Sequence, residues 1–250
     1  MSKALRAVTM AAFIIEQGTR VLKHRPHHLG QFYQTAWHAH RSRLTKCHLD
    51  QLFPGIMNKQ ISLIAPLAEE IGNVWPKELI ILAALCQYLQ PTTVFEIGTF
   101  NGRTTVNLAA NSLAAIHTLD IPADHPIFRR TAGEERYQLG DSAGIFYRQS
   151  EYKDRVTQWW ADSAEFDERP LVGTMDLVFV DGAHDDEHMK SDSEKAFRMI
   201  TDKGTIVWHD YSFRCPGVSD YLEGHELREH FFSIPDTRLV LFTRQSKARR

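Results

Sequence analysis

The sequence predicts an α/β protein in which helices cover a doubly wound, mostly parallel sheet, with a helical N-terminal extension. Three observations lead to this expectation. From residue 76 onward, short apolar runs such as "TVFEI" and "DLVFV" alternate with helical patterns, and such runs are typical of parallel strands buried on both faces. A glycine-containing turn follows the first run. The 250 residues, 43% of them hydrophobic, are enough for one such domain with an appendage.

Residues 1–75 form the predicted helical arm, which we expect to act as a lid. Residues 1–50 carry eight Lys and Arg residues but only two acids, and six of the 13 histidines of the chain. Two interpretations stay open: a basic surface for an anionic ligand, a membrane face or a partner subunit, and a solvated arm packed on the main domain. The apolar stretch 8–15 is interpreted as part of a helix and not as a signal peptide, because Glu16 ends it and no clear cleavage site follows.

The main domain is expected over residues 76–245, with a basic tail at 246–250. An irregular linker and a short helix, "ISLIAPLAEE" (61–70), precede it, and a charged insertion at 122–150 interrupts it as a second lid. Proline at the first helical position and apolar spacing predict the helices, and apolar runs predict the strands. The predicted helices are 76–90, 103–113, 185–200 and 217–230, and the predicted strands are 93–98, 115–121, 156–160, 175–182, 204–211 and 238–244.

The turn after the first strand reads E-x-G-x-x-x-G, with Glu96, Gly98 and Gly102 at the fixed positions. A dinucleotide pyrophosphate favours G-x-G-x-x-G, in which several glycine amides approach the phosphates. A carboxylate at this turn suits a cationic amino group or a sulfonium better. Gly98 is expected to let the backbone approach the ligand, and Gly102 to let the helix pack closely. The alternative interpretation is a simple tight turn between a strand and a helix.

The next strand ends at Asp120, where a carboxylate is well placed to accept hydrogen bonds from a ribose diol. The alternative is an aspartate that caps the loop before Pro122. Together, the acidic turn and the acidic second strand predict a nucleoside ligand that is not a phosphate. S-adenosylmethionine fits this description, since it combines a ribose, an adenine, an amino acid and a sulfonium.

These segments, together with "ADSAEFD" and "MDLVFVDGAHDDEHMKSDSEKAFRMITDKGTIVWHDY", resemble the class I S-adenosylmethionine-dependent methyltransferases. More narrowly, they resemble the small-molecule branch related to catechol O-methyltransferase and to macrolide-sugar O-methyltransferases. The resemblance covers about residues 76–245 and implies a Rossmann-like, seven-stranded sheet. The residues that it assigns to the cofactor are Glu96, Gly98, Thr99, Asn101 and Gly102 for the methionine end, Asp120 for the ribose, Asp162 and Ser163 for the adenine, and Asp181 at the end of the fourth strand.

The same resemblance implies a catalytic centre at the ends of the next two strands. Asp181 ends one strand, and His209 and Asp210 end the next, so we expect them to lie at one edge of the sheet. Related enzymes hold a divalent ion (Mg, Mn or another) with an acid at the first position and a pair at the second. His209 stands where relatives usually have an acid, and imidazole suits manganese, iron, cobalt or zinc better than magnesium. The alternative is that Asp181 contacts the cofactor while His209 and Asp210 satisfy loop hydrogen bonds.

His184, three residues after Asp181, is the predicted general base, because a neutral imidazole accepts a proton near pH 7. A helix-start histidine bonded to backbone is the alternative, and His188, one turn further on, ranks below it. The expected function is O-methylation of a small-molecule hydroxyl by direct displacement. A nucleic-acid or protein methyltransferase and a non-catalytic S-adenosylmethionine-binding relative remain as alternatives.

The amino-acid composition limits the kinds of partner and the location that we expect for this chain. The formal net charge of −2 argues against a bulk nucleic-acid binder, which is usually strongly basic. Three dispersed cysteines predict neither a disulfide framework nor a structural zinc site, so a reducing, cytoplasmic location is expected. No apolar stretch is long enough for a membrane span. A homodimer is expected from the family resemblance and the basic arm.

Overall fold

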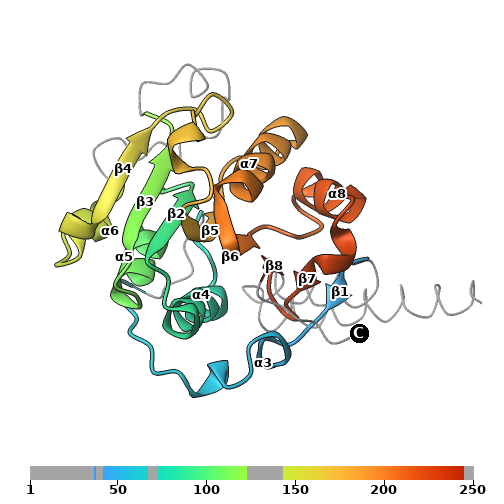
Figure 1. The fold of residues 1–250 in the computed structure, drawn as a ribbon, viewed down its shortest axis with the longest axis horizontal. Coiled ribbons are helices and arrows are strands. Elements are labelled where there is room, and N and C mark those ends of the chain that lie inside the picture. The colour runs from blue at the N-terminus through green and yellow to red at the C-terminus, as the bar shows by residue number, and fades with distance from the viewer. Residues whose placement is uncertain (1–36, 38–41, 67–71, 123–142, 245–250) are drawn as a thin grey trace, which may run out of the picture.

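The computed structural model describes residue 37 and the ranges 42–66, 72–122 and 143–244. Within them, eight strands form one sheet in the order β1-β7-β8-β6-β5-β2-β3-β4 (Figure 1). The strands are β1 (Thr45–Lys46), β2 (Thr93–Ile97), β3 (Ala115–Asp120), β4 (Val156–Trp160), β5 (Met175–Val180), β6 (Ile200–Trp208), β7 (Phe232–Ser233) and β8 (Val240–Thr243). The helices are α3 (Leu49–Leu52), α4 (Pro76–Leu89), α5 (Arg103–Ala110), α6 (Ile145–Arg148), α7 (Asp186–Met199) and α8 (Pro216–Gly224).

The central part of the sheet is parallel, as the sequence predicts. Strands β4, β3, β2, β5 and β6 pair in parallel register, and β8 pairs antiparallel with both β6 and β7. The chain order reverses between β2 and β5, which is the position where open α/β sheets bind ligands. The predicted doubly wound α/β fold is therefore confirmed. The sheet has eight strands instead of the expected seven, because β1 from the predicted arm pairs with β7 at the edge.

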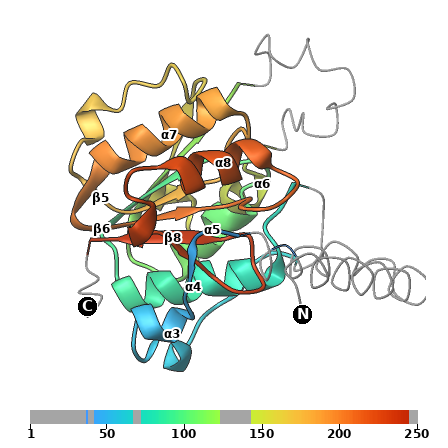
Figure 2. The same ribbon diagram turned by 90° about the vertical axis from the view of Figure 1, so that its right-hand side faces the viewer.

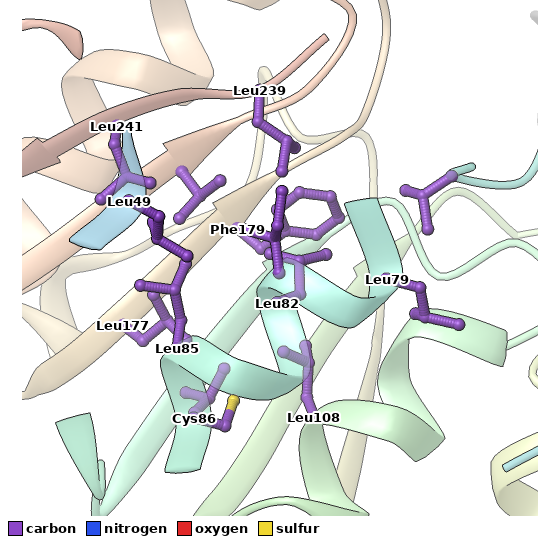
Figure 3. Close-up of a cluster of buried hydrophobic side chains, with 14 of the residues drawn as sticks. Leu49, Leu79, Leu82, Leu85, Cys86, Leu108, Leu177, Phe179, Leu239 and Leu241 are labelled. Carbon is purple, nitrogen blue, oxygen red and sulfur yellow. The ribbon is translucent and has the colours of Figure 1, made fainter. Parts of the chain in front are cut away.

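Helices cover both faces of the sheet (Figure 2). Helices α4 and α5 pack on one face, where strand residues such as Val94, Leu177 and Phe179 meet Leu82 and Leu108 in one buried cluster (Figure 3). Helices α7 and α8 cover the other face with a second buried cluster. Successive strand residues alternate between the two clusters, which is the pattern expected when side chains of a strand point to opposite faces.

The predicted arm contributes to the core where it is described. Leu49, Phe53 and Ile56 are buried in the same cluster as α4. The arm upstream of residue 42, apart from residue 37, and most of the charged insertion lie outside the described residues, so their predicted roles as lids stay predictions. None of the helices in the described ranges is both long and apolar enough to cross a membrane.

The short helix expected at 61–70 is wrong for residues 61–66, which form no helix. Asn107 of α5 and Asn111, the C-cap residue of this helix, bind the segment through its backbone. Asn107 accepts from the amide of Ile64 and donates to its carbonyl, at 2.9 and 2.8 Å. Asn111 makes the same pair of bonds to Ser62, at 2.8 and 2.7 Å. The side chains of α5 therefore replace the hydrogen bonds that a helix would have made internally.

The last predicted helix is shorter than expected. Helix α8 ends at Gly224, and a 3₁₀ turn at Arg228–His230 follows instead of a continuation to residue 230. His225, the residue after the helix, has extended backbone angles. The two-residue strands β1 and β7 were not predicted individually, because pairs of residues carry no periodicity.

Gly98 allows β2 and β5 to meet at the end of the sheet. It adopts φ +97°, and an added Cβ would lie 2.1 Å from the carbonyl oxygen of Asp181. The loop after β5 thus comes so close to residue 98 that only glycine fits there. The close approach to a ligand that the sequence predicts for Gly98 stays a prediction. Gly102, at φ +77°, is approached by Tyr147 and Gly144 next to α6, which fits the expected close packing.

We predict that Gly98→Ala lowers the free energy of unfolding by about 2–4 kcal/mol. Overpacking against backbone costs about 1–3 kcal/mol, and the left-handed conformation adds roughly 1 kcal/mol. Urea unfolding of the purified variant measures the change. Gly55→Ala is the matched control, because Gly55 has φ +87° but nothing within 4 Å of its added Cβ, so it carries only the conformational cost. Equal losses in the two variants would contradict the packing argument.

Candidate active site

The carboxyl ends of β2, β3, β5 and β6 lie at one edge of the sheet, because these strands are parallel neighbours. Glu96 and Asp120 belong to the first two strands, and Asp181 and His209 directly follow the other two. The amide of Asp181 donates to Ile97 and that of His209 donates to Val180, which fixes the loops to their neighbouring strands. The sequence-predicted acids are therefore brought to one edge.

Glu96 is fully buried at the end of β2. Its Oε2 accepts hydrogen bonds from the hydroxyls of Thr118, at 2.6 Å, and Thr105, whereas Oε1 is buried without a hydrogen-bond partner. Burial raises the pKa of Glu96 to about 8, against the effect of the two hydroxyls, and the nearby charges of Asp181 and Asp120 raise it further. Glu96 is therefore mostly protonated at pH 7 in this state, so direct contact with a cationic amino group remains a prediction.

Thr99 and Asn101, expected at the methionine end, have partners within the protein. Thr99 lies 2.7 Å from the hydroxyl of Thr118 and accepts from Gln158 at 3.0 Å. Asn101 accepts from the amide of Arg103 at 3.1 Å, at the start of α5. Both side chains are buried and hold the shape of the turn.

Asp120 occupies the position predicted for a ribose acid. Its Oδ2 accepts from the amide of Phe100 at 2.7 Å and its Oδ1 from the amide of Ile121 at 2.9 Å. Burial raises the pKa of the carboxyl, while these amides act in the opposite direction. The side chain joins the glycine turn to the end of β3, and one acceptor lone pair on each oxygen is enough for a diol.

The predicted adenine residues Asp162 and Ser163 follow β4. Asp162 accepts from the amide of Ala164 at 2.9 Å and lies 3.2 Å from His188 Nε2. Lys195 binds the carbonyl oxygen of Ser163. His188 also bonds Asp185, the N-cap of α7, at 2.9 Å, so this histidine connects α7 to the loop after β4.

His209 is buried between two acids. Its Nδ1 lies 2.7 Å from Asp181 Oδ1, and its Nε2 lies 2.9 Å from Glu78 Oε2. Carboxylates accept but do not donate when ionised, so both ring nitrogens carry hydrogens in this arrangement. Burial alone would lower the pKa of His209, but Asp181, Asp210 and Glu78 raise it well above its usual range.

Glu78 and Arg238 complete the cluster, and the sequence analysis did not find either of them. Glu78 comes from the first turn of α4 and is 0% exposed. Arg238 precedes β8, donates to Asp210 at 2.7 Å and to Glu78 at 3.1 Å, and stacks over Trp75 with 4.3 Å to the ring centroid. Burial acts to raise the pKa of Glu78, but His209 and Arg238 outweigh it and hold the pKa at about 2.

His184 pairs with Asp210 at the open side of the cluster. The distance from His184 Nε2 to Asp210 Oδ2 is 2.6 Å, and the histidine side chain is 49% exposed whereas the aspartate is 12% exposed. Burial lowers the pKa of His184, but the hydrogen bond and charge of Asp210 outweigh it and leave the pKa raised. Nδ1 of His184 has no hydrogen-bond partner within the described ranges, so it is the ring nitrogen that can accept a proton from a ligand.

Asp210 holds a strained backbone conformation, with φ 56°. A non-glycine residue in this region costs about 1–3 kcal/mol and persists where its surroundings fix it. Here His184, His209 and Arg238 all contact its carboxylate. The strain coincides with the residue that connects the exposed histidine to the buried cluster.

The predicted metal ligands Asp181, His209 and Asp210 have ligand atoms within 4.8 Å of one another. A second set with the same spacing consists of His184, Asp210 and Cys215. The first set does not fit a divalent ion in this arrangement. A ligating imidazole needs a deprotonated nitrogen, yet both nitrogens of His209 face carboxylates. Asp210 is already paired with Arg238.

The edge therefore combines an acid at the end of β3, a glycine turn without the dinucleotide pattern, and a histidine–aspartate pair after β5 and β6. This combination agrees with the class I methyltransferase resemblance of the sequence. Residues 95–211 match the family model described as a methyltransferase domain. This match agrees with the resemblance drawn from the sequence.

Individual proteins are also similar to this chain. Catechol O-methyltransferase B of Danio rerio is 30% identical over 159 residues, which cover 60% of this chain and 53% of that protein. The chain therefore spans about half the length of this curated relative. A methyltransferase from Geobacter sulfurreducens has a TM-score of 0.50 at 17% identity, over 70% of this chain and 82% of the other, which supports the fold alone. A putative O-methyltransferase from Klebsiella pneumoniae has a TM-score of 0.48 at 19% identity, over 77% and 87%.

Proposed function

We propose that this chain transfers the methyl group of S-adenosylmethionine to a hydroxyl group of a small molecule. The observation that carries the proposal is the 2.6 Å pair of His184 and Asp210, placed beside Asp181 at the ligand-binding edge of a methyltransferase domain. Catechol O-methyltransferase B, the relative at 30% identity, supports the choice of a hydroxyl acceptor.

S-adenosylmethionine would lie across the ends of β2 and β3. Asp120 is proposed to accept the ribose hydroxyls, because its two oxygens are fixed by backbone amides and retain acceptor capacity. Asp162 and Ser163 are proposed to border the adenine, and Glu96 and the turn that follows it to enclose the methionine end. When bound, the cofactor supplies an electrophilic methyl group on a sulfonium.

In the proposed reaction, His184 accepts the proton of the substrate hydroxyl at Nδ1 while Nε2 donates to Asp210. The substrate oxygen forms a bond to the methyl carbon, the carbon–sulfur bond breaks, and its electron pair goes to sulfur. The products are a methyl ether, S-adenosylhomocysteine and a protonated His184. Alignment of the oxygen with the methyl group and general-base catalysis supply the acceleration.

Calorimetric titration with S-adenosylhomocysteine, with NAD as the comparison ligand, tests the proposal. We expect saturable binding of S-adenosylhomocysteine and none of NAD, because the turn lacks the glycines that a pyrophosphate needs. Transfer of a labelled methyl group to a panel of phenols and sugar hydroxyls then tests the acceptor. A chain that binds only NAD would refute the proposal. Labelled product only in added RNA or protein would favour the alternative acceptors.

Asp120→Ala is expected to weaken S-adenosylhomocysteine binding by about 10–100-fold. Hydrogen bonds to a charged group contribute about 1.5–3 kcal/mol, which corresponds to that range of affinity. The same titration measures it. Asp202→Ala is the matched control, because Asp202 is exposed near the start of β6, away from this edge. Unchanged affinity in Asp120→Ala would contradict the ribose assignment.

Three finer expectations remain part of the proposal. A homodimer is tested by light scattering of the full chain, and a cytoplasmic location by fractionation. The divisions at residues 75 and 245 are tested by limited proteolysis. No metal takes part in the proposed step, because the donor set does not fit a divalent ion.

A further inference from the structure

The buried cluster behind His184 contains a fixed cation with an unusual set of contacts. Arg238 binds Glu78 by three donors, since its backbone amide, Nε and Nη2 lie 2.7, 3.3 and 3.1 Å from the two carboxylate oxygens. Its remaining terminal nitrogen, Nη1, lies 2.7 Å from Asp210 Oδ1. The guanidinium is stacked on Trp75, and its side chain is 17% exposed.

The chain itself supplies two cations that offset most of the negative charge of this cluster. Three carboxylates, those of Glu78, Asp181 and Asp210, converge here. Arg238 contacts two of them, and His209 lies 2.7 Å from the third and 2.9 Å from Glu78. Buried carboxylates without compensation are costly, so some cation is needed at this position. The chain supplies it through side chains.

We propose that Arg238, and not a divalent ion, is the fixed cation of this centre, and that it is a positioning residue for His184. Arg238 holds Oδ1 of Asp210, and Oδ2 of the same carboxylate holds Nε2 of His184. These two contacts, one on each oxygen, fix the orientation of the Asp210 carboxylate. The inference rests on the proposed function and adds to it that methyl transfer needs no metal.

Arginine is suited to this position for reasons that lysine does not share. Its guanidinium is planar, always charged and able to bind two carboxylates at fixed angles while it stacks on an aromatic ring. Arg238 uses all of these properties, through Glu78, Asp210 and Trp75. Glu78 in turn accepts from the amide of Trp75 at 2.7 Å, so the start of α4 is tied to the same cation.

The first test uses the unaltered protein after dialysis against EDTA. Calorimetric titration with Mn²⁺ and with Mg²⁺ should show no stoichiometric binding, and the midpoint of thermal unfolding should not change with either ion. Affinity for S-adenosylhomocysteine should also be the same with EDTA as with Mn²⁺. Stoichiometric binding of either ion, or turnover that EDTA abolishes and Mn²⁺ restores, would overturn the inference. The titration needs no methyl acceptor, so it stays decisive if the proposed function fails.

The second test addresses positioning. Arg238→Met is expected to lower kcat by at least tenfold, with little change in the KM for the methyl acceptor and in affinity for S-adenosylhomocysteine. Arg238→Lys should restore only part of kcat. Arg228→Met is the matched control, because Arg228 is exposed in the turn before β7. A folded Arg238→Met protein with unchanged kcat would refute the positioning role. Should that variant fail to fold, the metal titration still decides the inference.

Discussion

His184→Ala is expected to lower kcat by about 10²–10⁴-fold, the usual contribution of a general base, while S-adenosylhomocysteine binds with unchanged affinity. The side chain is half exposed and its strongest contact is Asp210, so its removal leaves the buried clusters intact. Steady-state kinetics and calorimetry on the same preparation measure the two quantities. His230→Ala is the matched control, since His230 is exposed in the turn before β7.

The pH profile gives an independent signature of the same residue. Only the neutral imidazole accepts a proton, and the pairing with Asp210 raises the pKa of His184 above its ordinary value near 6.5 despite burial. The acid limb of kcat/KM should therefore have its midpoint above 6.5. Full activity of His184→Ala, or an acid limb that is identical in that variant, would remove His184 as the base.

Glu78→Gln is expected to lower the free energy of unfolding at neutral pH by about 3–5 kcal/mol, the range for breaking a buried ion pair. The amide would leave His209 and Arg238 without their shared acid. Urea unfolding at pH 7 measures the loss. Glu151→Gln, at an exposed position, is the control and should change stability by less than about 0.5 kcal/mol.

The loss in Glu78→Gln should shrink in acid. The pKa of Glu78 falls on folding from its ordinary value near 4.5 to about 2. Its contribution, about 3 kcal/mol by linkage, is thus fully present above pH 4.5 and is lost as the pH falls toward 2. The gap between the two proteins should narrow from pH 6 to pH 3. A gap that does not change with pH would show that packing, not charge, makes Glu78 important.

The parts of the fold that the sequence predicts are those with long local patterns. Strands β2, β5 and β6 contain apolar runs buried on both faces, and the ends of β5 and β6 bring Asp181 and Asp210 to one edge by geometry alone. Segment 61–66 shows the limit. Its apolar spacing resembles a helix, but its hydrogen bonds go to Asn107 and Asn111, more than 40 positions away, which no local pattern reveals.

The residues of the candidate site also fall into two groups, those that the sequence predicts and those that it does not. His184 and Asp210 could be predicted because each follows a recognisable strand. Glu78 and Arg238 could not, since 160 positions separate them and each has an ordinary local explanation. Glu78 resembles the glutamate that caps a helix start, a role that it also fills, and Arg238 precedes the last strand as any loop arginine would. An acid in the first turn of a largely buried helix was the signal available for Glu78.

Asn107 of α5 and Asn111 at its C-cap bind segment 61–66 through backbone groups. Ser62 and Ile64 are bound by amide and carbonyl alone, so almost any side chain would satisfy the same contacts. We therefore expect residues 62 and 64 to vary widely among related sequences. Asn107 and Asn111 should vary little. Helix α5 would then keep its position against segment 61–66 while the side chains of that segment change.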